Sequence, residues 1–509
     1  MHQALLIDEI VQVVFDSCLD FGSGTLTRVA RTCKAWRDPA LDRLWYRLTD
    51  VTPLLQLVPG VFQVNGVYVF ESPVSPDLRI LRLYAPRVKH VVQRRNVQLH
   101  PHLSSILSSV DGLFTQLVTV QLSLVNCHSL CSILGPGTAL KSLDMDLGFH
   151  PGAFENSNSA ACNYLAYLPS LRSLSLRGSG SEALNRAIAA TSQLHSLSLR
   201  LSTSLNVETI AAISTFPELV HLEVHASHIR AADLANSLRS SNHDDGVFFP
   251  SLQSLNIRSS TSLAGAILQK LQSTGLRTIY LDVEPVAQTD DAWITLFNIM
   301  KDRTPNLHDF TIDHHIDTED PGLDSHAGHA NLNDNNDATT SQNDLEKLLR
   351  FELLHPLSSL RDLQRIVFDT TPPIMVRDED LEKLGSQWPK LAHLDLGSVP
   401  TVDPRWAPKV TLEGLASLST KPTNLRNLII PIDPSSSLSP NTAKPLVPRN
   451  TLRNITISTL SPPDTVAMAS CLANLFPFIE HVDGAVDHDE QWHDIQTAIR
   501  DMRSVLQSN

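Results

Sequence analysis

An apolar-x-x-apolar-x-apolar pattern, with leucine as the usual apolar residue, recurs along most of this chain. Thirteen segments carry it, and they begin at Leu78, Leu117, Leu140, Leu171, Leu194, Leu219, Leu252, Leu276, Leu307, Leu363, Leu391, Leu425 and Leu452; a degenerate copy begins at Ile479. Most intervals between copies are 23 to 34 residues long, a period typical of stacked structural repeats. The pattern therefore predicts a repeat array.

The spacing within each unit predicts a strand followed by a helix. The last two apolar residues of the pattern alternate with polar ones, as in a strand that buries one face. Helical spacing follows in the linking segments 183–190, 207–216, 231–238, 263–271, 292–300, 381–388 and 466–476. Prolines such as Pro169 and Pro217 precede several strands, where proline ends a helix and favours extended backbone. We expect an α/β solenoid with a concave parallel sheet and outer helices.

Residues 5–48 follow a different pattern, with three short segments of helical spacing. Leu6 and Ile10 belong to the first segment, Leu26 to the second and Leu44 to the third. Three helices of this length bury little surface. Their apolar residues exceed what so small a core can hide, so we expect this module to dock onto something.

The motifs LIDEIVQVVF, RVARTCKAW and LW-x-x-L resemble the F-box of fungal-type F-box proteins with C-terminal leucine-rich repeats. The family opens Leu-Pro, whereas Ile7 follows Leu6 here. The resemblance implies that the module binds a Skp-type adaptor and, through it, a cullin of a ubiquitin ligase. The adaptor-binding residues that it implies are Leu6, Ile7, Ile10, Phe15, Leu26, Ala30, Trp36, Leu44 and Trp45. The alternative is a small helical cap on the solenoid.

The repeats resemble leucine-rich repeats, although serine stands where that family has asparagine, at Ser179, Ser202, Ser227 and Ser260. The predicted organisation is a helical module at 1–50, a linker or cap at 51–77, the solenoid at 78–485 with an acidic insertion at about 314–344, and a C-terminal capping helix at 486–509.

The net charge of −14 is concentrated in one place, because 313–346 contains nine acidic residues and no lysine or arginine. This segment is polar and free of aromatic residues, so we expect it to be disordered. The rest of the chain is close to balanced. A general nucleic-acid-binding protein would carry a patch of basic residues instead, so no nucleic-acid partner is expected.

Six cysteines without CxxC spacing favour a reducing compartment. The chain has no signal-like opening and no apolar run long enough to span a bilayer. We therefore expect a protein of the cytoplasm, the nucleus or both, with no membrane partner.

Motifs of catalysis are absent from the sequence: it contains no G-x-S-x-G, P-loop or H-E-x-x-H. His314, His315, His326 and His329 lie with aspartates in the predicted flexible insertion, which offers no fixed metal geometry. We expect no catalytic residues, no metal and no cofactor.

The outward strand positions predict a binding face for a target protein, because tyrosine and arginine are enriched in binding hot spots. The residues expected there are His221, Glu223, His225, Asn256, Arg258, Tyr280 and Asp282. The favoured hypothesis is a substrate-recognition subunit of a Skp–cullin–F-box ubiquitin ligase. Alternatives are a repeat scaffold without a ligase role and a GTPase-activating protein that uses Arg258 or Arg200.

Overall fold

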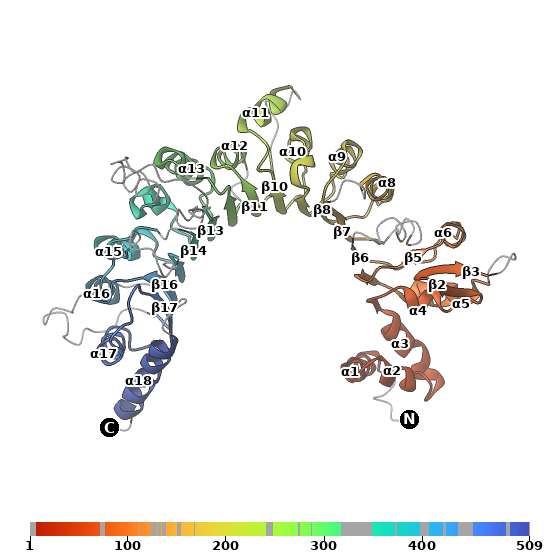
Figure 1. Ribbon diagram of the computed structural model, residues 1–509, viewed down its shortest axis with the longest axis horizontal. Coiled ribbons are helices and arrows are strands. Elements are labelled where there is room, and N and C mark those ends of the chain that lie inside the picture. Colours follow the sequence, from red (N-terminus) through yellow and green to blue (C-terminus); the bar gives the residue numbers. More distant parts are fainter. Residues whose placement is uncertain are drawn as a thin grey trace, which may run out of the picture. The chain divides into compact units, whose positions relative to one another are not determined.

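The structure is a computed structural model that describes residues 7–71, 77–110, 112–123, 130, 134, 139–149, 154–166, 168–240, 248–272, 275–286, 288–316, 349–371, 374–397, 407–420, 424–435, 451–484 and 489–507. The chain divides into two compact units, Met1–His225 and Ala226–Asn509. In each unit, helices cover one face of a parallel sheet (Figure 1). We call the other face of each sheet its open face.

Fifteen parallel strands lie in chain order among the described residues, seven in the first unit and eight in the second. Those of the first unit are β1 (Arg47–Leu48), β4 (His90–Gln93), β6 (Thr119–Leu122), β7 (Ser142–Gly148), β8 (Ser173–Gly178), β9 (Ser196–Arg200) and β10 (His221–His225). Those of the second unit are β11 (Ser254–Ser259), β12 (Thr278–Val283), β13 (Asp309–His314), β14 (Arg365–Thr370), β15 (His393–Asp395), β16 (Asn427–Pro431), β17 (Asn454–Ser458) and β18 (His481–Gly484).

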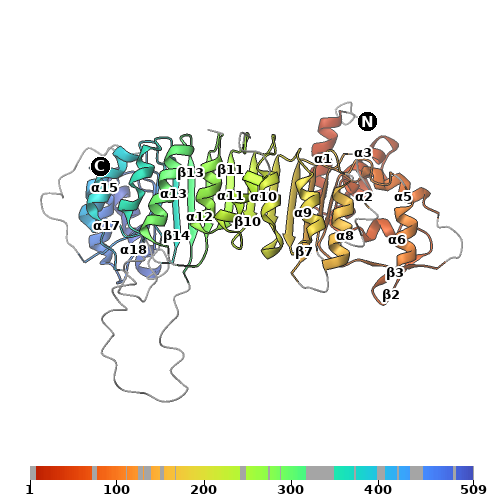
Figure 2. The ribbon, with the colours of Figure 1, turned by 90° about the horizontal axis from the view of Figure 1, so that it is seen from above.

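Helices link the strands within each unit (Figure 2). The first unit contains α1 (Asp8–Asp20), α2 (Ser23–Val29), α3 (Lys34–Trp45), α4 (Thr52–Leu55), α5 (Arg79–Tyr84), α6 (Pro101–Ser108), α8 (Phe154–Leu165), α9 (Glu182–Ala189) and α10 (Val207–Ile213), with short 3₁₀ turns η2 (Ala85–Arg87) and η4 (Ser202–Ser204). The second contains α11 (Ala231–Ser240), α12 (Thr261–Lys270), α13 (Asp290–Arg303), η5 (Phe351–Ser359), α15 (Asp378–Gln387), α16 (Leu412–Thr420), α17 (Thr465–Leu475) and α18 (Asp489–Gln507). No helix in these described ranges combines the length and apolar character needed to cross a bilayer.

The α/β class is confirmed, and so are the strands of the twelve copies from Leu117 onward and of the copy at Ile479. In β8, Leu174 and Leu176 are buried while Ser173 and Ser175 stay partly exposed. This alternation follows from the two-residue period of a strand. Leucines therefore face the helices, and polar residues face the open side.

The copy at Leu78 was predicted to be a strand, and this prediction is wrong because the segment forms helix α5. Leu81, Ala85 and Val88 are buried, whereas Ile80 and Leu83 are exposed. Burial at every third or fourth residue is the period of a helix. The side chain of Asp77 also accepts a hydrogen bond from the backbone N–H of Arg79 at 3.1 Å, which favours a helix start there.

Strand β4 was missed because a glutamine replaces the last leucine of the pattern. Gln93 has no solvent exposure. Its Oε1 accepts the backbone N–H of Val51 at 2.8 Å, and its Nε2 donates to the carbonyl of Arg95 at 2.7 Å. A buried amide with both ends engaged can take the place of an apolar residue.

Part of the predicted linker 51–77 forms an antiparallel hairpin, β2 (Val61–Val64) and β3 (Val67–Phe70), which is joined by β5 (Gln98–Leu99) in a three-stranded sheet. Asn65 and Gly66 both have positive φ, at 49° and 86°. Asn-Gly is the turn pair that such a two-residue hairpin favours. This local signal was available in the sequence.

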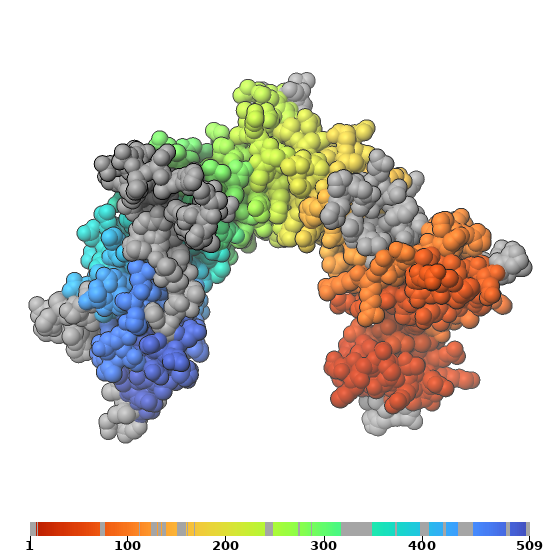
Figure 3. Space-filling model, viewed as in Figure 1, coloured from red at the N-terminus to blue at the C-terminus, as the bar shows by residue number. Residues whose placement is uncertain are grey.

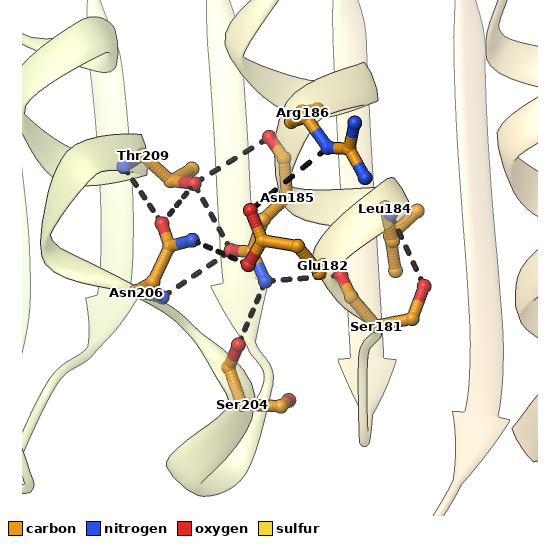
Figure 4. Close-up of polar contacts among 8 residues, drawn as sticks. All are labelled: Ser181, Glu182, Leu184, Asn185, Arg186, Ser204, Asn206 and Thr209. Carbon is orange, nitrogen blue, oxygen red and sulfur yellow. Dashed lines mark hydrogen bonds and ion pairs between the residues drawn. The ribbon is translucent and has the colours of Figure 1, made fainter.

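A buried network at Asn185 joins two neighbouring repeats of the first unit (Figure 4). Its Nδ2 donates to the carbonyls of Ser181 and Ser204, at 3.1 and 2.7 Å. Its Oδ1 accepts the backbone N–H of Asn206 at 3.3 Å and the hydroxyl of Thr209 at 3.0 Å. An asparagine thus bridges these repeats from helix α9, although none stands at the position where leucine-rich repeats usually have it.

The predicted insertion at about 314–344 is described only as far as residue 316. His314 is buried and ends β13, so assigning it to the loop was wrong. The remainder lies outside the described residues.

Candidate functional site

Helices α1, α2 and α3 pack around one small apolar core. It consists of Val11, Phe15, Leu26, Ala30 and Ala40, with Val14, Cys18, Leu19, Val29, Trp36, Leu41 and Leu44 packed against it. Phe15 and Trp36 meet edge to face, with ring centroids 6.1 Å apart. Gly22 has φ 105° just before α2, a conformation that glycine adopts without strain.

Three residues expected at the adaptor surface lie inside this core, which corrects the part they play. Phe15, Leu26 and Ala30 are at most 8% exposed, so a partner cannot reach them while the module is folded. Trp36 and Leu44 pack partly buried against the core. These side chains hold the three helices together and support the exposed surface without forming it. Leu6 lies outside the described residues.

Apolar side chains on α1 and directly beside it stay uncovered by the described part of the chain. Ile7, Ile10, Val13 and Phe21 are 47%, 40%, 66% and 84% exposed. The spacing of three residues puts the first three on one side of the helix. We call these four residues the α1 stripe. Several exposed apolar side chains on one small module are typical of a surface that docks onto a partner.

Trp45 has a second role that was not expected. Its ring lies 5.2 Å from the ring of Tyr84 in α5, and the tryptophan is partly buried. It therefore packs α3 against the segment that follows. A Trp45→Ala variant that lost adaptor binding would not by itself identify a direct contact.

Arg87 fixes α3 to η2. Its guanidinium donates to the carboxylate of Asp38 at 2.8 Å and to the carbonyl of Asp38 at 3.2 Å, and it pairs with Asp42. Tyr46 adds a ring contact with His90 of β4 at 4.7 Å. In Figure 3 the surface of the first helices (red) is continuous with that of the next residues (orange). Helix α3, against which α1 packs, is thus attached to η2 and to strand β4.

The open face of the first unit forms a polar cavity of about 460 Å³. Glu223 lies in its lining, where it accepts hydrogen bonds from Arg200 Nε and Ser198 Oγ, both at 2.8 Å. His221 and His225 stand on the same strand as Glu223. These three predicted residues therefore share one strand of this open face.

The remaining predicted target residues lie on the open face of the second unit. Arg258 is 3.5 Å from Asp282, and the hydroxyl of Tyr280 donates to Asp313 at 2.7 Å. Burial raises the pKa of Tyr280 and that of Asp282. Asn256 occupies the register position beside Tyr280. The role of all these residues in binding stays a prediction.

The two arginines considered for GTPase activation are both engaged within the sheet. Arg200 pairs with Glu223, and Arg258 pairs with Asp282. An arginine that stabilises a transition state must instead reach a bound nucleotide. The geometry gives this alternative no support.

One cluster of possible metal ligands was missed by the sequence reading, because one of its members comes from a different repeat. Asp313, His315 and Asp369 bring three possible ligand atoms within 4.8 Å of one another. The Nε2 atom of His315 is 3.2 Å from Asp313 and 3.4 Å from Asp369, distances that ion pairs explain. His314 lies apart from this cluster, with its ring nitrogen 3.1 Å from the carbonyl of Val286. His326 and His329 lie outside the described residues.

Comparison with known proteins bears on the first helices. The model of the F-box-like family matches residues 8–50. These residues form an F-box-like domain. No curated protein matches the chain by sequence.

Two solved structures are similar to much of the chain. One is from the crystal structure of the yeast Rad7 and Elc1 complex, with 13% identity, coverage of 77% of this chain and 74% of that chain, and a TM-score of 0.33. The other is from the Drosophila Toll–Spatzle complex, with 11% identity, coverage of 81% and 60%, and a TM-score of 0.27.

The F-box-like domain contains most of the residues expected at the adaptor surface, and the α1 stripe is its uncovered side. Ile10, Val13 and Phe21 fall within the matched residues, and Ile7 lies directly before them. The structure thus divides the apolar residues of this domain into a buried core and an accessible face.

Proposed function

We propose that the chain is the substrate-recognition subunit of a Skp–cullin–F-box ubiquitin ligase. The observation that carries the proposal is the α1 stripe, an apolar face that an F-box-like domain presents to solvent. A Skp-type adaptor covers this face and links the chain to a cullin. An open face of the repeats binds the target protein, which then lies near the ubiquitin-conjugating enzyme.

The chain contributes proximity in this proposal, and its residues carry out no bond-breaking step. Holding two reactants together raises their effective concentration without covalent chemistry. The junction at Arg87 and Trp45 supports this role, because it attaches the F-box-like domain to the first strands.

The repeats are, in the same proposal, leucine-rich repeats of the fungal F-box type. The leucine pattern and the strand-plus-helix units support this assignment. The chain acts in the cytoplasm, the nucleus or both. The alternative remains a repeat scaffold whose N-terminal helices never bind an adaptor.

The test is binding of a purified Skp-type adaptor to the intact chain and to the double variant Ile10→Glu, Val13→Glu. Both side chains are exposed, so the variant should fold. Two carboxylates placed in an apolar interface should weaken binding by about a hundredfold or more. Gln12→Glu adds one such charge to an exposed position of α1 away from the stripe and should leave affinity unchanged. Absence of binding by the intact chain would favour the scaffold.

A further inference from the structure

Three carboxylates stand in one row across the open face of the second unit. The strand register pairs Arg258 with Asp282, Asp282 with Asp313, and Asp313 with Asp369. Neighbouring strands are about 4.8 Å apart, and like charges directly opposite each other are destabilising. We call Asp282, Asp313 and Asp369 the acidic row.

Among the described residues, two side chains that can carry positive charge lie beside this row. Arg258 is 3.5 Å from the first carboxylate, and His315 lies beside the other two. Arg365 pairs with Asp309 at the opposite end of the strands. Outward positions on β11–β15 therefore hold five carboxylates against two guanidinium groups; the carboxylates are Asp282, Asp309, Asp313, Asp369 and Asp395.

Some of these carboxylates have lost part of their hydration. Burial raises the pKa of Asp282 and of Asp395, which shows that their charged forms are less stable here than in water. A cation held against the face would restore that stabilisation. Tyr280 stands next to the row and donates to Asp313. A tyrosine ring beside carboxylates offers a surface against which the stem of a long basic side chain can pack.

We propose that the acidic row docks an extended, arginine-bearing segment of the target protein. The charge of the sheet face is complementary to such a segment, and the guanidinium fork matches a carboxylate in two parallel hydrogen bonds. The inference rests on the proposed function and names the chemical class of its target. The target-binding residues predicted from the sequence lie on β10–β12, whereas the acidic row lies on β12–β14.

The experiment measures fluorescence anisotropy of a labelled peptide of alternating arginine and serine with the full chain. A matched peptide has citrulline in place of arginine, which keeps the shape and removes the charge. The double variant Asp313→Asn, Asp369→Asn keeps the side-chain volumes and should weaken binding of the arginine peptide about tenfold or more. The double variant Asp291→Asn, Asp302→Asn, which removes two exposed carboxylates on α13, is the control and should leave binding unchanged.

Three outcomes would overturn the proposal. One is equal loss in the two double variants, because the effect would then reflect net charge alone. Another is equal binding of the citrulline peptide. The third is tight binding of zinc chloride through Asp313, His315 and Asp369 without binding of the arginine peptide. Adaptor binding by the same variants distinguishes failure of this proposal from failure of the proposed ligase function. Loss of the acidic row should leave adaptor binding intact.

Discussion

At the scale of single residues, Asn185 forms hydrogen bonds that join two neighbouring repeats of the first unit. It is 2% exposed, and its amide makes two donated and two accepted hydrogen bonds. An asparagine side chain offers two donors and one oxygen with two lone pairs. Every polar group of this amide is therefore satisfied.

We expect Asn185→Leu to lower the free energy of unfolding by about 1–3 kcal/mol, because it leaves the carbonyl of Ser204 and the backbone N–H of Asn206 without their buried partner. Leucine keeps the branched shape, but its methyl groups are larger than the amide groups, so tighter packing adds to the loss. Chemical denaturation measures the loss. Asn298→Leu places the same substitution on an exposed position of α13 and should be nearly neutral. Equal stability of Asn185→Leu and the intact chain would contradict a structural role for the network.

At the scale of elements, helix α18 protects the last strand of the second unit. β18 ends the strand order, and an unpaired edge is a template for aggregation. Gln496 reaches this edge, where its Oε1 accepts the N–H of Val482 at 2.5 Å and its Nε2 donates to the carbonyl of Glu480 at 3.0 Å. Trp492, Ile495 and Ile499 bury the apolar side of the same helix.

Replacing Gln496 by leucine should expose the edge of β18 to other chains. Leucine still packs but cannot bond the strand, so we expect faster amide exchange at Val482 and concentration-dependent self-association in light scattering. Asp494→Leu adds an equally apolar side chain to the exposed side of α18. It separates an effect of surface apolarity from an effect of the lost hydrogen bonds. Self-association of both variants to the same extent would count against the assigned role of Gln496.

At the scale of the whole molecule, one buried and two half-buried histidines link stability to pH. Burial lowers the pKa of His90, His314 and His393 below the ordinary value of 6.5. In this range the unfolded chain binds more protons than the folded chain, so stability rises with pH. The contribution is complete well above the unfolded value of 6.5 and is lost as the pH falls through it.

Unfolding free energy should therefore decrease between pH about 7.5 and about 5.5, before most carboxylates titrate. His314→Gln removes one of the three groups and should make this dependence shallower, whatever its effect on absolute stability. Denaturation curves at several pH values compare the slopes. An identical slope in the variant would mean that His314 is not protonated preferentially in the unfolded state.

The sequence by itself determined the repeat architecture. The six-residue leucine pattern of each copy specifies which positions of its strand are buried. Twelve copies from Leu117 onward formed strands for this reason. The copy at Leu78 did not, because the same spacing of leucines also suits one side of a helix when burial follows every third or fourth residue.

Only the tertiary structure decided which residues meet. Phe15 and Val13 are both apolar residues of α1, yet one lies in the core and the other in solvent. The acidic row combines three strands, and its member Asp369 comes 56 residues after Asp313 in the chain. The local sequence pattern determines which positions of each strand or helix are buried. Packing between helices and register between strands determine which side chains come together on a surface.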